Sequence, residues 1–156
     1  HSWREVHRGL DALADGFDVV MCPERQLYFD YAQSDAADEP IPVGRVTTLE
    51  SVYRYDPIPA GTGGPGRLLG AQANLWTEHL DSARRLHYAA FPRLCAFAEN
   101  LWSPLEAHDY PDFVGRLEAA HLGRLAALGV DHRPLAGPRP WQRRPGVAGT
   151  LRLPAG

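Results

Sequence analysis

The feature that most constrains the fold is an apolar segment that ends abruptly in a tryptophan and a carboxylate. Residues 67–75 have the composition of a short buried strand, and Trp76 and Glu78 follow it directly. Side chains at positions i and i+2 of extended backbone point to the same side. Trp76 and Glu78 are therefore expected to face one space together.

An upstream stretch repeats this arrangement. The apolar residues 17–21 are predicted to form a strand, and Tyr28 and Asp30 come after it, again two positions apart. Two strand ends that each offer an aromatic ring and an acid suit a polyhydroxylated sugar ring. Its flat C–H faces pack on aromatic surfaces, and its hydroxyls donate hydrogen bonds to carboxylates. From the residues alone, Tyr28 could equally be a rim tyrosine, Asp30 a solvated turn residue and Trp76 a core tryptophan.

The order of the predicted elements favours a parallel α/β architecture. Residues 3–14 carry apolar side chains at helical spacing and stop at Gly16. The stretch 82–102 has a helical pattern interrupted by Pro92, which predicts two helices that meet there. With the two strands placed between these segments, the order helix, strand, helix, strand, helix predicts a parallel sheet.

Two further helices are predicted from capping patterns. Thr47 with Glu50 forms a capping box for a short helix that ends near Tyr55. Asp109 or Asp112 is predicted to cap a last helix, which ends at Gly129. The predicted apolar stripe of this last helix consists of Val114, Leu117, Leu125 and Leu128.

The predicted polar chemistry lies just after the strands, as on the C-terminal face of a (β/α)₈ barrel. Such barrels need about 250 residues, and this chain has 156. It could therefore supply only the last part of one. Residues 1–133 are assigned to the barrel, and residues 134–156, which are rich in Pro, Gly and Arg, to a C-terminal tail.

Charge and composition narrow the classes of partner. The net charge is −3 and the pI about 6.2, which gives no basic field for nucleic acid. No apolar run approaches the length of a membrane span. Cys22 and Cys95 stand far apart in apolar contexts and are predicted to be free thiols. The chain starts at His1, without a methionine and within helix-like sequence, so its true N-terminus is expected upstream and secretion cannot be judged.

Motifs for nucleotides, metals and nucleophilic serine are not supported. Gly61, Gly63 and Gly66 fit the spacing of a dinucleotide loop, but they lead into a strand rather than a helix. The seven histidines show no clustered metal spacing, and there is no G-x-S-x-G elbow. We therefore predict no metal and no cofactor.

At the segments just described the chain resembles the C-terminal part of glycoside hydrolase family 20, the β-N-acetylhexosaminidases. The resemblance covers about residues 1–133. It rests on four segments in family order: Ser2-Trp3-Arg4, Tyr28-Phe29-Asp30-Tyr31, Trp76-Thr77-Glu78, and Phe91-Pro92-Arg93 through to Trp102. It implies that the two predicted strands are about strands seven and eight of a TIM barrel.

The resemblance also implies roles for the site residues. In this family the 2-acetamido oxygen of the substrate is the nucleophile, and Tyr28 matches the tyrosine whose phenol donates a hydrogen bond to that oxygen and helps hold the oxazolinium geometry. Trp76 matches the indole that walls the acetamido pocket, and Trp3 resembles another tryptophan of that pocket. Asp30 and Glu78 match acids that bind hydroxyls at O4 or O6.

Other residues of these segments are interpreted as structural. Arg93, Glu99 and Trp102 lie in a predicted helix and are expected to clamp it to the barrel. Asp38-Glu39 looks like the family's catalytic pair, but it follows the Tyr28 segment, whereas the family's pair precedes it on strand four. The general acid is therefore expected outside this chain, and the chain alone is expected to be inactive.

The implied function is that of an exo-glycosidase. The full-length protein would release terminal non-reducing N-acetylhexosamine from oligosaccharides or glycoconjugates with retention of configuration. A non-catalytic sugar-binding relative that has lost the acid is the alternative. A third interpretation, an α/β protein without a sugar site, requires the ordered motifs to be coincidental.

Overall fold

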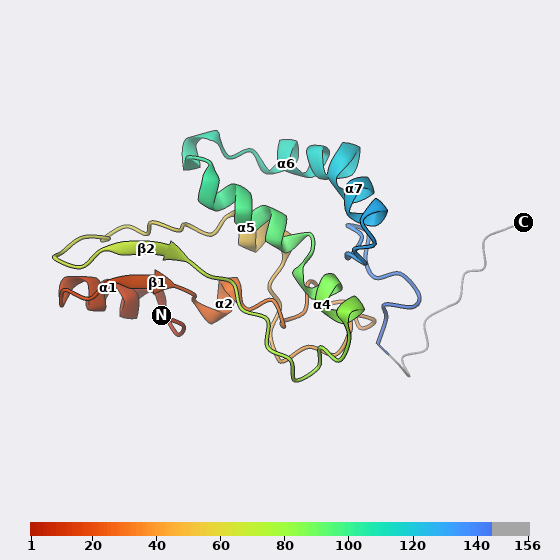
Figure 1. Cartoon of the computed structure of the whole chain (residues 1–156), viewed down its shortest axis with the longest axis horizontal. Coiled ribbons are helices and arrows are strands. Elements are labelled where there is room, and N and C mark those ends of the chain that lie inside the picture. The colour runs from red at the N-terminus through yellow and green to blue at the C-terminus, as the bar shows by residue number, and fades with distance from the viewer. Residues whose placement is uncertain (145–156) are drawn as a thin grey trace, which may run out of the picture.

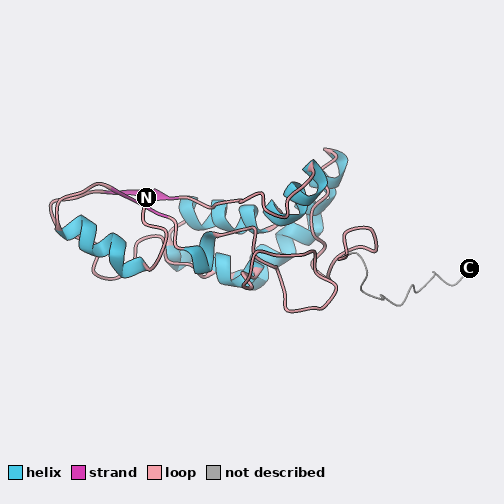
Figure 2. Cartoon of the chain, turned by 90° about the horizontal axis from the view of Figure 1, so that it is seen from below, coloured by secondary structure: helices cyan, strands magenta, loops and turns pink. Residues whose placement is uncertain are grey.

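The computed structural model describes residues 1–144 as two short strands and a set of helices in an elongated arrangement (Figures 1 and 2). The strands are β1 (Val19–Met21) and β2 (Leu68–Ala71). The helices are α1 (Val6–Ala14), α2 (Glu24–Leu27), α3 (Leu49–Tyr53), α4 (Ala83–Ala90), α5 (Arg93–Trp102), α6 (Tyr110–Arg116) and α7 (Leu122–Ala127), with a 3-10 turn η1 (Leu105–Ala107) and a π-helical segment η2 (Leu117–His121).

The two strands are parallel, as the order of elements predicted. Met21 pairs with Ala71, and the register shifts by one residue between Val19 and Val20. A third backbone segment joins on the other side of β1, where Ser2 forms a parallel bridge with Met21. Ser2 donates to the Val20 carbonyl at 2.9 Å and accepts from the Cys22 N–H at 2.9 Å. Three parallel segments therefore lie in the order Ser2, β1, β2.

Tyr28 does not follow β1 directly, which corrects the simple strand-end prediction. Pro23 comes after the strand and begins the one-turn helix α2, because proline has no N–H to continue the ladder. The chain then returns to the sheet: Tyr28 forms a parallel bridge with Asn74. The Phe29 N–H donates to the Asn74 carbonyl at 2.7 Å, and the Asn74 N–H donates to the Leu27 carbonyl at 2.8 Å. Parallel pairing therefore continues beyond the carboxyl ends of β1 and β2.

Two apolar clusters hold the elements together. The smaller one packs Leu13 of α1 against Val19 and Met21 of β1. Gly9 lies directly against the Met21 side chain and leaves no room for a Cβ atom. The larger cluster joins α3, α5, α6 and the Phe29 segment through Leu27, Phe29, Val52, Tyr53, Tyr55, Ala96, Phe97, Phe113 and Leu117.

The predicted break at Pro92 is confirmed. Phe91 is extended, with φ −108° and ψ 139°, and it separates α4 from α5. Pro92 is the N-cap residue of α5 rather than its first helical residue. The Ser82 side chain caps α4 by accepting from the Arg85 N–H.

Two details of the predicted helices change, and one open alternative is resolved. Thr48, not Thr47, caps α3, because its hydroxyl accepts from the Ser51 N–H at 3.0 Å. Asp109 rather than Asp112 caps α6. Leu128 is 69% exposed and leaves the apolar stripe, because it is the C-cap residue of α7, where the helix ends.

Residues 131–144 pack on the helical part without helix or strand. The buried Gln142 side chain donates to Asp131 and His132, and Arg143 pairs with Asp38 at 3.1 Å. The predicted boundary at residue 133 stays a prediction, and residues 145–156 of the predicted tail lie outside the described part. Among the described residues, no helix combines the length and apolarity that a membrane crossing requires.

Candidate active site

The five side chains predicted from sequence to bind a sugar line one cavity of about 550 Å³, which we call the site cavity. They are Trp3, Tyr28, Asp30, Trp76 and Glu78. The i, i+2 pairs predicted at the two strand ends thus open onto the same space. The structure brings all five together, although they come from three parts of the chain.

The sheet explains this convergence. Trp3, Cys22 and Gln72 each directly follow the last paired residue of one of the three parallel segments, and all three line the site cavity. Parallel strands present their carboxyl ends at one edge, so whatever follows them collects there. The cavity therefore lies at the carboxyl end of the sheet.

Aromatic rings form one wall of the site cavity. The Tyr28 ring lies 6.0 Å from the Trp76 ring at 57°, and 5.9 Å from the Tyr31 ring at 51°. These spacings are typical of tilted aromatic pairs. Trp76 is 50% exposed, so much of its indole surface is free to pack on a ligand. Burial raises the pKa of the Tyr28 phenol, which remains a hydrogen-bond donor at neutral pH.

Asp30 is a buried carboxylate whose bonding capacity is unused. It is 6% exposed, and neither side-chain oxygen has a hydrogen-bond partner among the described residues. Burial raises the pKa of its carboxyl and the Glu78 carboxylate acts in the same direction, whereas the nearby backbone N–H groups of Asp30 and Trp76 lower it. A buried carboxylate without partners is costly. Its two oxygens can accept hydrogen bonds from a bound polyhydroxylated molecule.

Glu78 completes the polar lining of the site cavity from the Asn74 side of the Tyr28–Asn74 bridge. It is exposed and lies two residues beyond Trp76. The site cavity therefore has two carboxylates that can accept hydrogen bonds. Glu78 is exposed at its mouth, and Asp30 is buried inside it. Hydroxyls of one ligand can donate to both.

Sequence reasoning missed further polar or aromatic residues of the cavity, among them Gln72, Asn74 and Tyr31. Gln72 and Asn74 line it from β2 and its continuation, and their side chains are hydrogen-bonded to each other at 2.5 Å. The signal was present, because they extend the i, i+2 series that ends in Trp76 and Glu78. Tyr31 also lines the cavity, although its position next to Asp30 predicts the opposite side of extended backbone.

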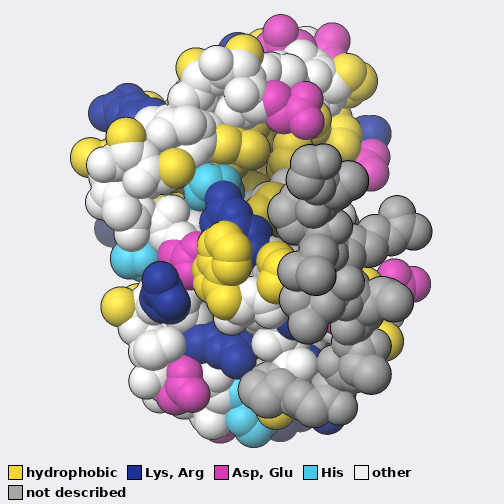
Figure 3. All heavy atoms as spheres, turned by 90° about the vertical axis from the view of Figure 1, so that its right-hand side faces the viewer, with side chains coloured by type: hydrophobic (Ala, Val, Ile, Leu, Met, Phe, Trp, Pro, Cys, Tyr) yellow, Lys and Arg dark blue, Asp and Glu magenta, His cyan; other side chains and the backbone are white. Residues whose placement is uncertain are grey.

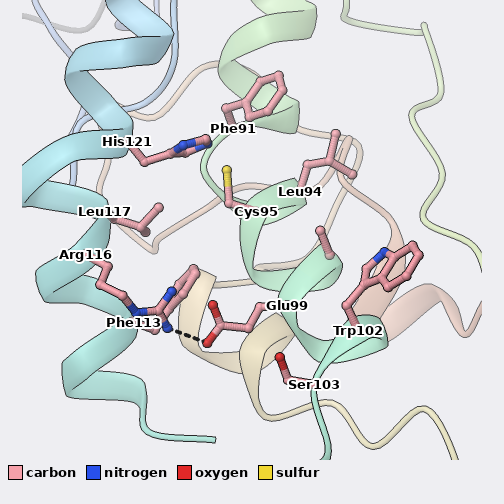
Figure 4. Close-up of a pocket in the computed structure, with 11 residues that line it drawn as sticks. Phe91, Leu94, Cys95, Glu99, Trp102, Ser103, Phe113, Arg116, Leu117 and His121 are labelled. Atoms are coloured by element: carbon pink, nitrogen blue, oxygen red, sulfur yellow. Dashed lines mark hydrogen bonds and ion pairs between the residues drawn. The ribbon is translucent and has the colours of Figure 1, made fainter.

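A second cavity, of about 540 Å³, lies between α5 and the α6–η2 segment (Figure 4). We call it the helix cavity. Its lining is mostly apolar, with Phe91, Leu94 and Phe113 among its walls. Glu99 crosses it to pair with Arg116 at 2.7 Å and accepts from the Tyr53 hydroxyl at 3.2 Å.

The three residues that were expected to clamp α5 have different environments. Arg93 is fully buried, and Glu99 is tied to α6 through Arg116. Trp102 clamps nothing among the described residues: it is 89% exposed, because it is the last residue of α5 and lies on the outer rim in Figure 4.

Glu39 has a structural environment rather than a catalytic one. It is 4% exposed and accepts from Ser34 at 2.6 Å and from Tyr88 at 2.7 Å. Arg133 pairs with it at 2.8 Å. These contacts tie the loop that follows the site to α4 and to the segment after α7, and they satisfy the carboxylate.

The remaining surface shows no concentration of one charge on the face seen in Figure 3, where acidic and basic side chains are intermingled. The described residues contain no group of three or more His, Cys, Asp or Glu that could hold a metal ion. The thiols of Cys22 and Cys95 are free.

Comparison with known proteins finds one family model along most of the chain. Residues 1–105 match "Glycosyl hydrolase family 20, catalytic domain". A beta-hexosaminidase of Porphyromonas gingivalis is 42% identical over 138 residues, which are 86% of this chain and 18% of that protein. A beta-hexosaminidase of Vibrio furnissii is 37% identical over 63% of this chain and 17% of its own length.

Solved structures agree with this similarity. The exo β-N-acetylglucosaminidase of Vibrio harveyi in complex with N-acetylglucosamine superposes with a TM-score of 0.77 at 34% identity, over 85% of this chain and 21% of that one. The β-N-acetylhexosaminidase of Streptomyces coelicolor gives a TM-score of 0.66 at 29% identity, over 79% and 25%. The chain spans about a fifth of the length of the proteins it matches.

Proposed function

Because the chain belongs to glycosyl hydrolase family 20, we propose that the protein it comes from is an exo-glycosidase. It releases terminal N-acetylglucosamine or N-acetylgalactosamine from the non-reducing ends of oligosaccharides or glycoconjugates. The fold is of the TIM-barrel α/β type found in its structural neighbours.

One observation carries this proposal: the buried carboxylate of Asp30, which has no side-chain partner among the described residues, lies beside the aromatic wall of Tyr28 and Trp76. A sugar ring presents apolar C–H faces and outward hydroxyls, and it meets both kinds of surface in one site. Most small-molecule sites combine an apolar wall with a few convergent polar groups in the same way.

Each of the five predicted residues of the cavity then has a role. Tyr28 donates a hydrogen bond from its phenol to the 2-acetamido oxygen and orients it, and that oxygen attacks the anomeric carbon in a substrate-assisted, retaining reaction. Trp76 and Trp3 enclose the acetamido group. Asp30 and Glu78 accept hydrogen bonds from the hydroxyls of the same terminal sugar.

The rest of the machinery lies elsewhere in the protein. We assign β1 and β2 to strands seven and eight of the barrel, with Ser2 at the end of the strand before them. The Asp-Glu pair that supplies the general acid belongs to an earlier strand. This chain spans about a fifth of its relatives, which leaves room for that pair outside residues 1–133. Residues 134–156 follow the barrel as a tail.

The test is hydrolysis by the full-length protein. Aryl β-N-acetylglucosaminide and β-N-acetylgalactosaminide are assayed beside an aryl β-glucoside, which has no acetamido group. Turnover of the first two only, with a β-configured sugar as the first product by NMR, is the expected result. Equal turnover of the glucoside, or an inverted product, would overturn the substrate-assisted mechanism.

A further inference from the structure

Arg93, the first residue of α5, is fully buried, and its guanidinium donates hydrogen bonds to backbone carbonyls alone. Nη1 donates to Thr47 at 2.9 Å and to Tyr31 at 3.1 Å. Nη2 donates to Ala89 at 2.7 Å and to Phe29, and Nε donates to Ala89 at 3.2 Å. These five bonds occupy the five N–H donors of the side chain.

Two of these carbonyls flank Asp30. The guanidinium holds Phe29 on one side of the acid and Tyr31 on the other, and it stacks 4.8 Å above the Phe29 ring. Asp30 and Arg93 also line a small cavity of about 20 Å³. Asp30 therefore lies between this small cavity and the site cavity, on backbone that one side chain fixes from both sides.

The electrostatic surroundings of Arg93 determine its charge state. None of the ion pairs found in the described part of the chain includes it. Burial lowers the pKa of its guanidinium to about 9, so it stays positive at neutral pH. The buried Glu39 and Asp30 carboxylates and the Tyr88 phenol favour that charge, and Arg133 opposes it.

The same charge acts on Asp30. Burial raises the pKa of the Asp30 carboxyl and Glu78 raises it further, whereas the backbone N–H groups of Asp30 and Trp76 and the Arg93 guanidinium act in the opposite direction. A carboxylate that must accept hydrogen bonds from sugar hydroxyls has to stay ionised, and a nearby cation favours the ionised form. The geometry and the charge of Arg93 therefore serve the same group.

We propose that Arg93 is a positioning residue for the sugar site: it fixes the backbone on both sides of Asp30 and supplies the buried positive charge that keeps this carboxylate an acceptor. The inference rests on the function proposed above. It goes beyond a clamp between α5 and the sheet, because a clamp alone needs no positive charge next to the site.

The experiment compares Arg93→Gln and Arg93→Lys in the full-length protein, with kcat/KM for an aryl β-N-acetylglucosaminide measured across pH. Arg93→Gln removes the charge, so the acidic limb of the profile is expected to move up by about one pH unit. Arg93→Lys keeps the charge and is expected to leave the limb in place. Arg116→Gln, which removes an arginine of the helix cavity, is the matched control and should not move it.

A double-mutant cycle covers the case in which Arg93→Gln fails to fold. If Arg93 acts through Asp30, Arg93→Lys costs about tenfold in kcat/KM in the wild-type background but less than twofold in an Asp30→Asn background. Equal costs in both backgrounds, or an unmoved limb in a folded Arg93→Gln protein, would overturn the proposal.

Affinity for N-acetylglucosamine, measured by calorimetry at the same pH values, separates this proposal from the parent one. A protein that binds the sugar with an Arg93-dependent pH profile but does not turn over substrate refutes only the hydrolytic function. A protein that hydrolyses substrate with additive Arg93 and Asp30 effects refutes only the positioning role. Loss of both binding and turnover in the wild-type protein refutes both.

Discussion

The site cavity and the helix cavity have nearly the same volume, about 550 and 540 Å³, yet they differ in how their acids are satisfied. In the helix cavity, Glu99 is bonded to Arg116 and to Tyr53. In the site cavity, Asp30 has no side-chain partner among the described residues. A carboxylate that already accepts hydrogen bonds within the protein has few free acceptor positions for a ligand. A buried carboxylate without partners destabilises the protein, and a ligand that donates hydrogen bonds to it removes this cost. Bonding state, and not volume, separates the two.

A buried polar atom without a hydrogen-bond partner indicates a ligand site only where it also lines a cavity. The Tyr55 hydroxyl and the Asn100 carbonyl oxygen are also buried without a partner among the described residues, but they belong to the packing around α3 and α5. Asn100 donates to the carbonyls of Val52 and Tyr53, which fixes its amide for structural reasons. Asp30 alone of the three lines the site cavity.

The largest expected difference between the two cavities is in catalysis. Tyr28→Phe in the full-length protein should lower kcat by about 10²- to 10³-fold, with a smaller change in KM, because its hydrogen bond holds the acetamido oxygen in the orientation that attack on the anomeric carbon requires. Steady-state kinetics on an aryl β-N-acetylglucosaminide measure this. Glu78→Gln touches a non-reacting hydroxyl and should change KM at least as much as kcat. A Tyr28→Phe enzyme with normal kcat would leave Tyr28 as a rim tyrosine.

The next effect concerns recognition. Asp30→Asn should reduce kcat/KM by about 10- to 150-fold, the usual range for loss of hydrogen bonds to a charged group. Glu99→Gln, the matched change in the helix cavity, should leave kcat/KM within about twofold. If the two variants lose activity equally, the distinction between the cavities is wrong.

How far the sequence predicted these regions depended on periodicity. The i, i+2 spacing predicted which side chains meet in the site cavity, because strand geometry is rigid. It did not predict the return of the chain at Tyr28 after α2, which depends on pairing with a residue 46 positions later. The helix cavity was not foreseen at all, since it lies between α5 and the α6–η2 segment and depends on how these helices pack, a tertiary effect without a local signal.

Stability should respond to Glu99 where activity does not. Glu99→Gln removes a half-exposed ion pair with Arg116 and weakens the bond from Tyr53, which is expected to cost about 1 kcal/mol of unfolding free energy. Urea unfolding of the full-length protein, followed together with Arg116→Gln and the double variant, measures the coupling. A coupling near zero would show that solvent replaces the pair.

The smallest expected effect is a dependence of stability on pH. Removing the Asp30 carboxylate is expected to stabilise the folded protein at neutral pH, whereas Glu99→Gln destabilises it. The pKa of Asp30 is raised above its ordinary value of 3.8 in the folded state, so the folded protein holds this proton more tightly than the unfolded chain. Stability therefore falls as pH rises from about 3.8 through the raised folded pKa. Asp30→Asn should abolish this component, and its melting temperature relative to wild type should be higher at pH 7 than at pH 3.5. A constant difference across pH would contradict the burial argument.

The bridge between Tyr28 and Asn74 has a consequence for how such sites diversify. Reciprocal backbone hydrogen bonds at Asn74 join the two halves of the cavity beyond the carboxyl end of β2, whereas residues 57–66 lead from α3 into the opposite end of that strand. Insertions or deletions before Gly64 can accumulate without displacing either half, whereas Gly64 and Gly66 pack closely against the end of α1 and the backbone at Phe17. The mouth of the site and the length of the loop are thus free to vary independently over evolution.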